Sequence, residues 1–88
     1  NDRKREVAEF YTTESPEVID SFLRAFDVSY VIVGSLERAV ANPRTLELFA
    51  ENPSLRLVFG NEQLGIYAVD KQMLAYAPRA VLTAVADG

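Results

Sequence analysis

Residues 28–33 (VSYVIV) limit what this chain can fold into more than any other part of the sequence. The run is apolar almost throughout, rich in β-branched and aromatic residues, and of strand length, which is typical of a strand covered on both faces. Gly34 ends the run, and Ser35 can cap a short helix that extends to Val40. The run therefore predicts a buried strand, with Tyr30 in the core, and an abrupt turn into a helix.

Two amphipathic helices are predicted before this strand. Residues 3–13 carry Val7, Phe10 and Tyr11 at helical spacing. A second helix begins after Ser15, whose side chain can cap it, with Pro16 in the first helical position. Its apolar residues fall on one stripe, as expected for a helix that packs on a core: Val18, Ile19, Phe22, Leu23 and Phe26.

Residues 42–69 predict one more helix and a hairpin. Asn42 can cap a helix that ends at Asn52-Pro53, because the residue before a proline is disfavoured in helical conformation. Residues 55–60 and 64–69 then form two strands joined by a short glycine-containing loop, with Tyr67 in the core. The first of these strands alternates between Leu55, Leu57 and Phe59 on one side and Arg56, Val58 and Gly60 on the other.

These elements predict one soluble α/β domain over residues 1–88, in the order α-α-β-α-β-β. The three strands are expected to form a mixed sheet with helices packed on it. The strand order 1-3-2 is favoured over 1-2-3, because Arg56 suits an edge strand. The tail, residues 71–88, either covers the sheet or forms an exposed contact surface with Met73, Leu74, Val81, Leu82 and Val85.

The residues that the sequence lacks argue against several kinds of chemistry. There is no histidine and no cysteine, so zinc, haem and nucleophile pairs such as Ser-His lack their usual groups. The net charge of −4 argues against nucleic acid, because phosphates require clustered basic residues. Acid–base catalysis needs converging acids; Glu37 with Glu47 or Asp70 is one conceivable pair, but nothing in the spacing requires these residues to converge. We expect no catalytic residue, no metal and no cofactor.

The one candidate binding site is the turn formed by Gly34, Ser35, Glu37 and Arg38. A strand end that opens onto a helix N-terminus can bind an anion through free N–H groups. Phosphate loops normally contain several glycines or a Gly-Lys-Ser/Thr ending, and this turn has neither. We favour a structural joint, in which Glu37 and Arg38 contact neighbouring backbone or an opposite charge.

Two blocks of the sequence match the pattern of a known family. In FDVSYVIVGSLERAV the matching residues are Val28, Tyr30, Val31, Val33, Gly34, Leu36, Glu37 and Arg38. In LRLVFGNEQLGIYAV they are Val58, Phe59, Asn61, Ile66, Tyr67 and Val69. Together with the lead-in REVAEFYTTESPEVIDSFLRAF, roughly residues 3–69 resemble the C-terminal soluble segment of the YYY membrane proteins of bacteria and archaea. These polytopic proteins are similar in layout to C-type glycosyltransferases.

The resemblance implies a non-catalytic accessory domain on the extracytoplasmic side of the cell membrane. It would be attached to the transmembrane portion of the same polypeptide, whose loops carry the acidic catalytic residues in such proteins. Contact with a lipid-linked sugar or an acceptor would come through that longer protein. The absence of an initiator Met also suggests a fragment. The alternative is a stand-alone small-molecule or phosphate-binding module that uses the Gly34-Ser35 turn.

Overall fold

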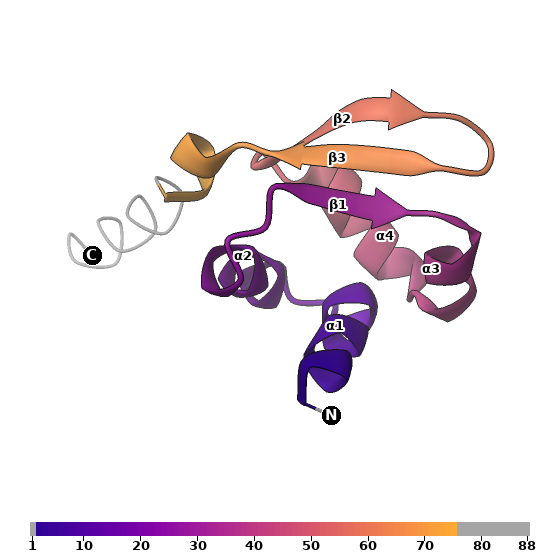
Figure 1. The fold of residues 1–88 in the computed structure, drawn as a ribbon, viewed down its shortest axis with the longest axis horizontal. Coiled ribbons are helices and arrows are strands. Elements are labelled where there is room, and N and C mark those ends of the chain that lie inside the picture. Colours follow the sequence, from indigo (N-terminus) through magenta and orange to yellow (C-terminus); the bar gives the residue numbers. More distant parts are fainter. Residues whose placement is uncertain (1, 76–88) are drawn as a thin grey trace.

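The computed structural model describes residues 2–75, which form helices packed against a three-stranded sheet (Figure 1). The elements are α1 (Asp2–Thr12), α2 (Pro16–Ala25), β1 (Tyr30–Val33), α3 (Ser35–Val40), α4 (Pro43–Glu51), β2 (Leu55–Gly60) and β3 (Gly65–Val69). Residues 71–75 add one more helical turn. The fold is a small α/β fold, as the sequence predicts.

The sheet has the predicted strand order, β1-β3-β2, with β3 in the centre and β2 at an edge. Both strand pairings are antiparallel, so the expectation of a mixed sheet is wrong. The short β2–β3 loop reverses the chain, and β3 then lies between β1 and β2. These two outer strands run in the same direction without pairing to each other (Figure 1).

Ser15 and Asn42 begin helices, as predicted. The Ser15 Oγ accepts a hydrogen bond from the backbone N–H of Val18 at 3.3 Å, and the Asn42 Oδ1 accepts one from the N–H of Arg44 at 2.8 Å. The predicted order counted a single helix between the first two strands. The structure has two, α3 and α4, because Ala41 and Asn42 are extended and Asn42 starts the helix anew.

Burial alternates along β1, which separates the two faces of the sheet. Val31 and Val33 are 3% and 4% exposed, whereas Tyr30 and Ile32 are 61% and 50% exposed. The expectations that both faces of this strand are covered and that Tyr30 lies in the core are therefore wrong. The reason is that α1, α2 and α4 contribute their buried side chains to a single core on one face.

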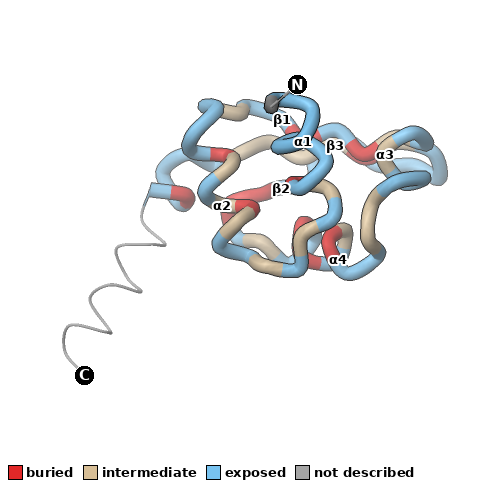
Figure 2. The backbone as a smooth tube through the Cα atoms, turned by 90° about the horizontal axis from the view of Figure 1, so that it is seen from below, coloured by how far each residue is buried: buried red, intermediate tan, exposed pale blue. Residues whose placement is uncertain are grey.

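The core between these helices and the sheet is centred on aromatic rings, and Figure 2 marks its buried positions in red. The Phe10 ring stacks on Phe22 at 4.5 Å and on Phe49 at 5.0 Å between ring centroids. Tyr67 meets Phe49 edge-on at 6.3 Å and packs against the core, as predicted. Rings from α1, α2, α4 and β3 thus hold four elements together.

β2 departs from the predicted alternation. Its register shifts between Leu57 and Phe59, so Val58 is an extra residue on this strand, as in a β-bulge. Only Leu55 is buried, and the three residues that follow Arg56 are each about half exposed. A bulge at an edge strand discourages pairing with another strand.

The free edge of β1 is closed by Tyr11 on α1. Val69 donates its N–H to the Ser29 carbonyl, and in an antiparallel pair alternate residues point to the partner strand. Ile32 therefore points its backbone carbonyl away from β3. The Tyr11 hydroxyl donates a hydrogen bond to this carbonyl at 2.7 Å, so α1 supplies the partner that the sheet edge lacks.

Only the first part of the tail lies within the described residues. Leu74 is buried, and its carbonyl accepts a hydrogen bond from Arg24 Nη1 of α2 at 3.3 Å, whereas Met73 is half exposed. The contact residues predicted further along, Val81, Leu82 and Val85, lie outside the described residues. Within residues 2–75, no helix combines the length and the apolar character needed to cross a bilayer.

The bond between Tyr11 and Ile32 gives a first prediction. Tyr11→Phe is expected to lower the free energy of unfolding by about 1 kcal/mol, because it removes one hydrogen bond that the Ile32 carbonyl accepts. Urea denaturation measures this change. Tyr30→Phe is the matched control and should have little effect, because the Tyr30 side chain is largely exposed. Equal losses in the two variants would contradict the edge-closing role of Tyr11.

Candidate functional site

The candidate turn is built around the Glu37 carboxylate, which folds back over the start of α3. Gly34 is the N-cap residue, and its N–H donates a hydrogen bond to Glu37 Oε1 at 2.7 Å. A capping box has two reciprocal hydrogen bonds, and this is the one made by the side chain of the third helical residue. The other bond needs an N-cap side chain, which glycine lacks. Ser35 is the first helical residue and not the cap, so the prediction of a serine cap is wrong.

The absence of a side chain at Gly34 leaves room for the Glu37 carboxylate. Its φ of −100° lies in the extended region, which any residue can adopt, so the backbone conformation does not require a glycine here. A Cβ at this position would lie 3.0 Å from Glu37 Oε1. A side chain at position 34 would therefore require the Glu37 carboxylate to shift by a few tenths of an ångström from its present contact with the Gly34 N–H.

Arg38 connects the same turn to the tip of the β2–β3 hairpin. Its Nη1 donates a hydrogen bond to the Glu62 carbonyl at 3.1 Å, across 24 residues of sequence. In the hairpin loop, Asn61 Oδ1 accepts hydrogen bonds from the N–H groups of Gln63 and Leu64. Arg38 thus binds a loop that has its own internal hydrogen bonds, and it joins α3 to the tip of the hairpin at the same end of the sheet.

The four predicted site residues therefore lie together, and the contacts of Glu37 and Arg38 are internal, as the joint interpretation predicts. An anion at the start of α3 would compete with the Glu37 carboxylate for the Gly34 N–H. The other two acids considered with Glu37 have their own partners. Glu47 pairs with Arg44 at 3.1 Å, and the Asp70 carboxylate accepts a hydrogen bond from the N–H of Met73.

Two open hollows flank Arg38. One, of about 520 Å³, lies against the sheet and is mostly apolar, with Val33, Leu46, Leu57, Leu64 and Tyr67 among its lining residues. The other, of about 350 Å³, is formed by Ser35, Arg38, Glu62 and Gln63. Arg38 is the only cationic residue in either lining, and its Nη1 is engaged by a carbonyl oxygen.

Tyr11 lies beside this turn and is held in its protonated form. Burial, and secondarily the negative charge of Glu37, raises the pKa of the Tyr11 hydroxyl from 10.0 to about 12. At neutral pH the hydroxyl therefore serves as the donor to Ile32 and not as a base. Among the described residues, no three acids come together as a metal site would need.

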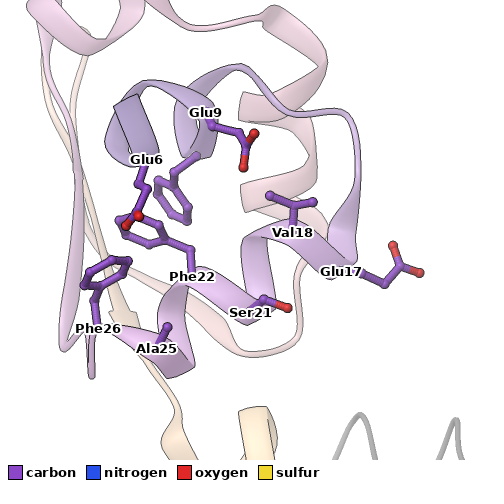
Figure 3. Close-up of a pocket in the computed structure, with 9 residues that line it drawn as sticks. Glu6, Glu9, Glu17, Val18, Ser21, Phe22, Ala25 and Phe26 are labelled. Atoms are coloured by element: carbon purple, nitrogen blue, oxygen red, sulfur yellow. The ribbon is translucent and has the colours of Figure 1, made fainter. Parts of the chain in front are cut away.

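A groove between α1 and α2 was not anticipated from the sequence (Figure 3). It is an open hollow of about 520 Å³ with Phe22 and Phe26 on its apolar floor and three glutamates at its rim: Glu6, Glu9 and Glu17. The apolar stripe of residues 18–26 predicts that both phenylalanines lie in the core. The available signal was the spacing of Glu6, Glu9 and Phe10, which places two acids and a core residue on one flank of a helix.

Comparisons with known proteins leave the family assignment as a prediction. No family model matches this chain, and no curated protein or solved structure matches it. The functional argument therefore rests on the residues and surfaces described above.

The Arg38 contact gives a second prediction. Arg38→Ala is expected to lower the free energy of unfolding by about 1 kcal/mol, because the hairpin loses a charge-assisted hydrogen bond to its loop. Thermal denaturation measures the effect. Arg56→Ala, which removes an exposed arginine from β2, is the control and should change stability by less than about 0.5 kcal/mol. An unchanged Arg38→Ala midpoint, together with stabilisation of the parent chain by inorganic phosphate, would instead show a ligand site.

The raised pKa of Tyr11 gives a third prediction. Because the pKa is higher in the folded chain than its ordinary value of 10.0, this group stabilises the fold below pH 10, and its contribution is lost as the pH rises toward about 12. Across this window, urea denaturation should show a steeper fall in stability for the parent chain than for Tyr11→Phe. Parallel pH dependences would show that Tyr11 titrates normally.

Proposed function

We propose that this chain is a non-catalytic accessory domain of a polytopic membrane protein that resembles a glycosyltransferase, located on the extracytoplasmic side of the cell membrane. Its role is to dock against the transmembrane portion of the same polypeptide. The observation that carries the proposal is the face of the sheet opposite the helices, called here the outer face.

The outer face is mostly apolar, and no element within residues 2–75 covers it. The strand register places Tyr30 and Ile32 of β1 beside Ala68 and Ile66 of β3, and these beside Arg56 and Phe59 of β2. Tyr30, Ile32 and Phe59 are 61%, 50% and 48% exposed. Arg56 is the only charged residue among the six, so the face resembles the inner surface of a two-layer protein more than a solvated surface.

The size of the outer face favours a tethered partner. With side chains of this size, it offers on the order of 400 Å² of apolar surface, within the range of functional patches on single proteins. Two such faces packed together would bury roughly 800 Å², less than stable interfaces between separate proteins need. A partner on the same polypeptide can dock through a smaller interface, because the covalent connection raises its effective concentration at the outer face.

The candidate turn supports a structural and not a chemical role. The Glu37 carboxylate accepts a hydrogen bond from Gly34, and the Arg38 guanidinium donates one to the hairpin loop. These two bonds connect α3 to the sheet whose outer face docks. Contact with a lipid-linked sugar or with an acceptor would then be made jointly with the membrane portion. No cofactor is part of this proposal.

The fourth prediction tests docking and location together. The sequence has no cysteine, so single cysteines can be introduced into this segment of the longer polypeptide. In intact cells, a membrane-impermeant maleimide should label Leu36→Cys rapidly, because Leu36 is 79% exposed and lies on α3. Ile32→Cys should react about tenfold more slowly there, whereas both cysteines should react at similar rates in the isolated chain.

Several outcomes would contradict the proposal. Equal labelling of the two cysteines in the longer polypeptide would show that the outer face is free. Labelling of Leu36→Cys only after lysis would exclude the extracytoplasmic side, and a reading frame without upstream apolar segments would exclude the membrane portion. Glycosyl transfer or hydrolysis by the isolated chain, abolished by Glu37→Gln, would contradict the non-catalytic role. Phosphate binding lost in Arg38→Ala would favour the small-molecule module.

A further inference from the structure

We infer that the groove between α1 and α2 binds a basic amphipathic helix of a partner protein, a role separate from docking of the outer face. The groove is lined by residues of α1 and α2 and by Phe26, whereas the outer face is formed by the three strands, so one domain can hold both contacts. The inference rests on the floor of the groove, on its rim, and on the shape that two packed helices leave between them.

The floor of the groove is aromatic and already accepts a cation. Phe22 on α2 and Phe26, the C-cap residue of this helix, have ring centroids 4.7 Å apart, and Figure 3 shows their rings side by side. The guanidinium of Arg3 lies over the Phe26 ring, 5.2 Å from its centroid, within the range of a cation–π contact. Arginine and lysine side chains combine an apolar stem with a charged head, and the groove suits both parts.

The rim of the groove is acidic and not neutralised. Glu6 and Glu9 extend from α1, and Glu17 lies at the start of α2 (Figure 3). Within residues 3–75, none of these carboxylates forms an ion pair, and Glu17 only accepts a hydrogen bond from the Ser15 hydroxyl at 3.1 Å. Three carboxylates beside an apolar floor, none of them in an ion pair among the described residues, attract a partner that carries positive charges beside an apolar stripe.

The shape of the groove favours a helix as the occupant. Its walls are two helices in contact, and its α2 wall includes the small residues Ser21 and Ala25 beside Val18. Small side chains between larger ones leave room for the ridge of another helix. A helix with leucines at i, i+3, i+4 and i+7 and basic residues on both flanks uses the same mode as other helix-in-groove complexes.

Two other occupants fit the groove less well. A second copy of this chain offers basic residues on α1 but little apolar surface beside them, because Phe10 is only 3% exposed in its own core and Val7 is 38% exposed. An anionic membrane surface would be repelled by the glutamates. The charge and the apolar floor together therefore favour a basic helix from another protein.

The test uses the full chain and a defined probe. A fluorescein-labelled helical peptide with leucines at i, i+3, i+4 and i+7 and lysines on the flanks is titrated by fluorescence anisotropy. We expect binding of this peptide and no binding of the same peptide with glutamate in place of every lysine. The double variant Glu9→Lys/Glu17→Lys should weaken binding at least about tenfold, because each reversal turns an attraction into a repulsion.

A matched control separates the groove from the overall acidity of the chain. Glu51→Lys/Glu62→Lys changes the net charge equally at exposed positions outside the groove and should change the dissociation constant less than about threefold. Phe26→Ala should also weaken binding, while circular dichroism confirms that it is folded. Equal weakening by both charge variants, binding of the glutamate peptide, or no binding at all would overturn the inference. None of these outcomes depends on whether the outer face docks to a membrane portion.

Discussion

The aromatic stack of Phe10, Phe22 and Phe49 is the interaction on which the rest of this structure depends. It joins α1, α2 and α4 in one layer, and Tyr67 extends the contact to the central strand. Because each of these rings is large, a chain of 88 residues has the material for one such core and not for two. The stack therefore places the core on one face of the sheet, and none of the described elements covers the outer face.

The remaining polar contacts hold this one-sided arrangement in register. The Tyr11 hydroxyl links the aromatic layer to the edge of β1 through its hydrogen bond to the Ile32 carbonyl. Arg38 links α3 to the tip of the hairpin through its hydrogen bond to the Glu62 carbonyl. The first bond is to a backbone carbonyl of β1, and the second is to a backbone carbonyl of the β2–β3 loop. The Gly34 turn, which has the position of an anion site, is filled by the Glu37 carboxylate. The described contacts of this turn thus stabilise the fold, and the surfaces suited to partners are the outer face and the α1–α2 groove.

The local signals in the sequence were sufficient for the elements but not for their surroundings. Ser15, Pro16 and Asn42 act within one helical turn, so their roles were predictable, and Arg56 correctly indicated an edge strand. The apolar run at Tyr30 and Ile32 was interpreted as buried on both faces, because composition does not reveal whether a second layer of the same polypeptide covers a strand. The bulge at Val58 and the groove rim at Glu9 depend on how distant segments meet, which no local pattern encodes.

The central claim is that the sheet has one buried and one free face, and neighbouring residues on β1 test it most directly. Val31 and Ile32 differ little in chemistry but are 3% and 50% exposed. The decisive measurement is the thermal midpoint of the isolated chain carrying either Val31→Lys or Ile32→Lys. Val31→Lys should unfold the protein or cost more than about 3 kcal/mol, because it buries an unpaired charge, whereas Ile32→Lys should cost less than about 1 kcal/mol. Equal destabilisation by the two variants would show that the outer face is covered within this chain and would contradict the account.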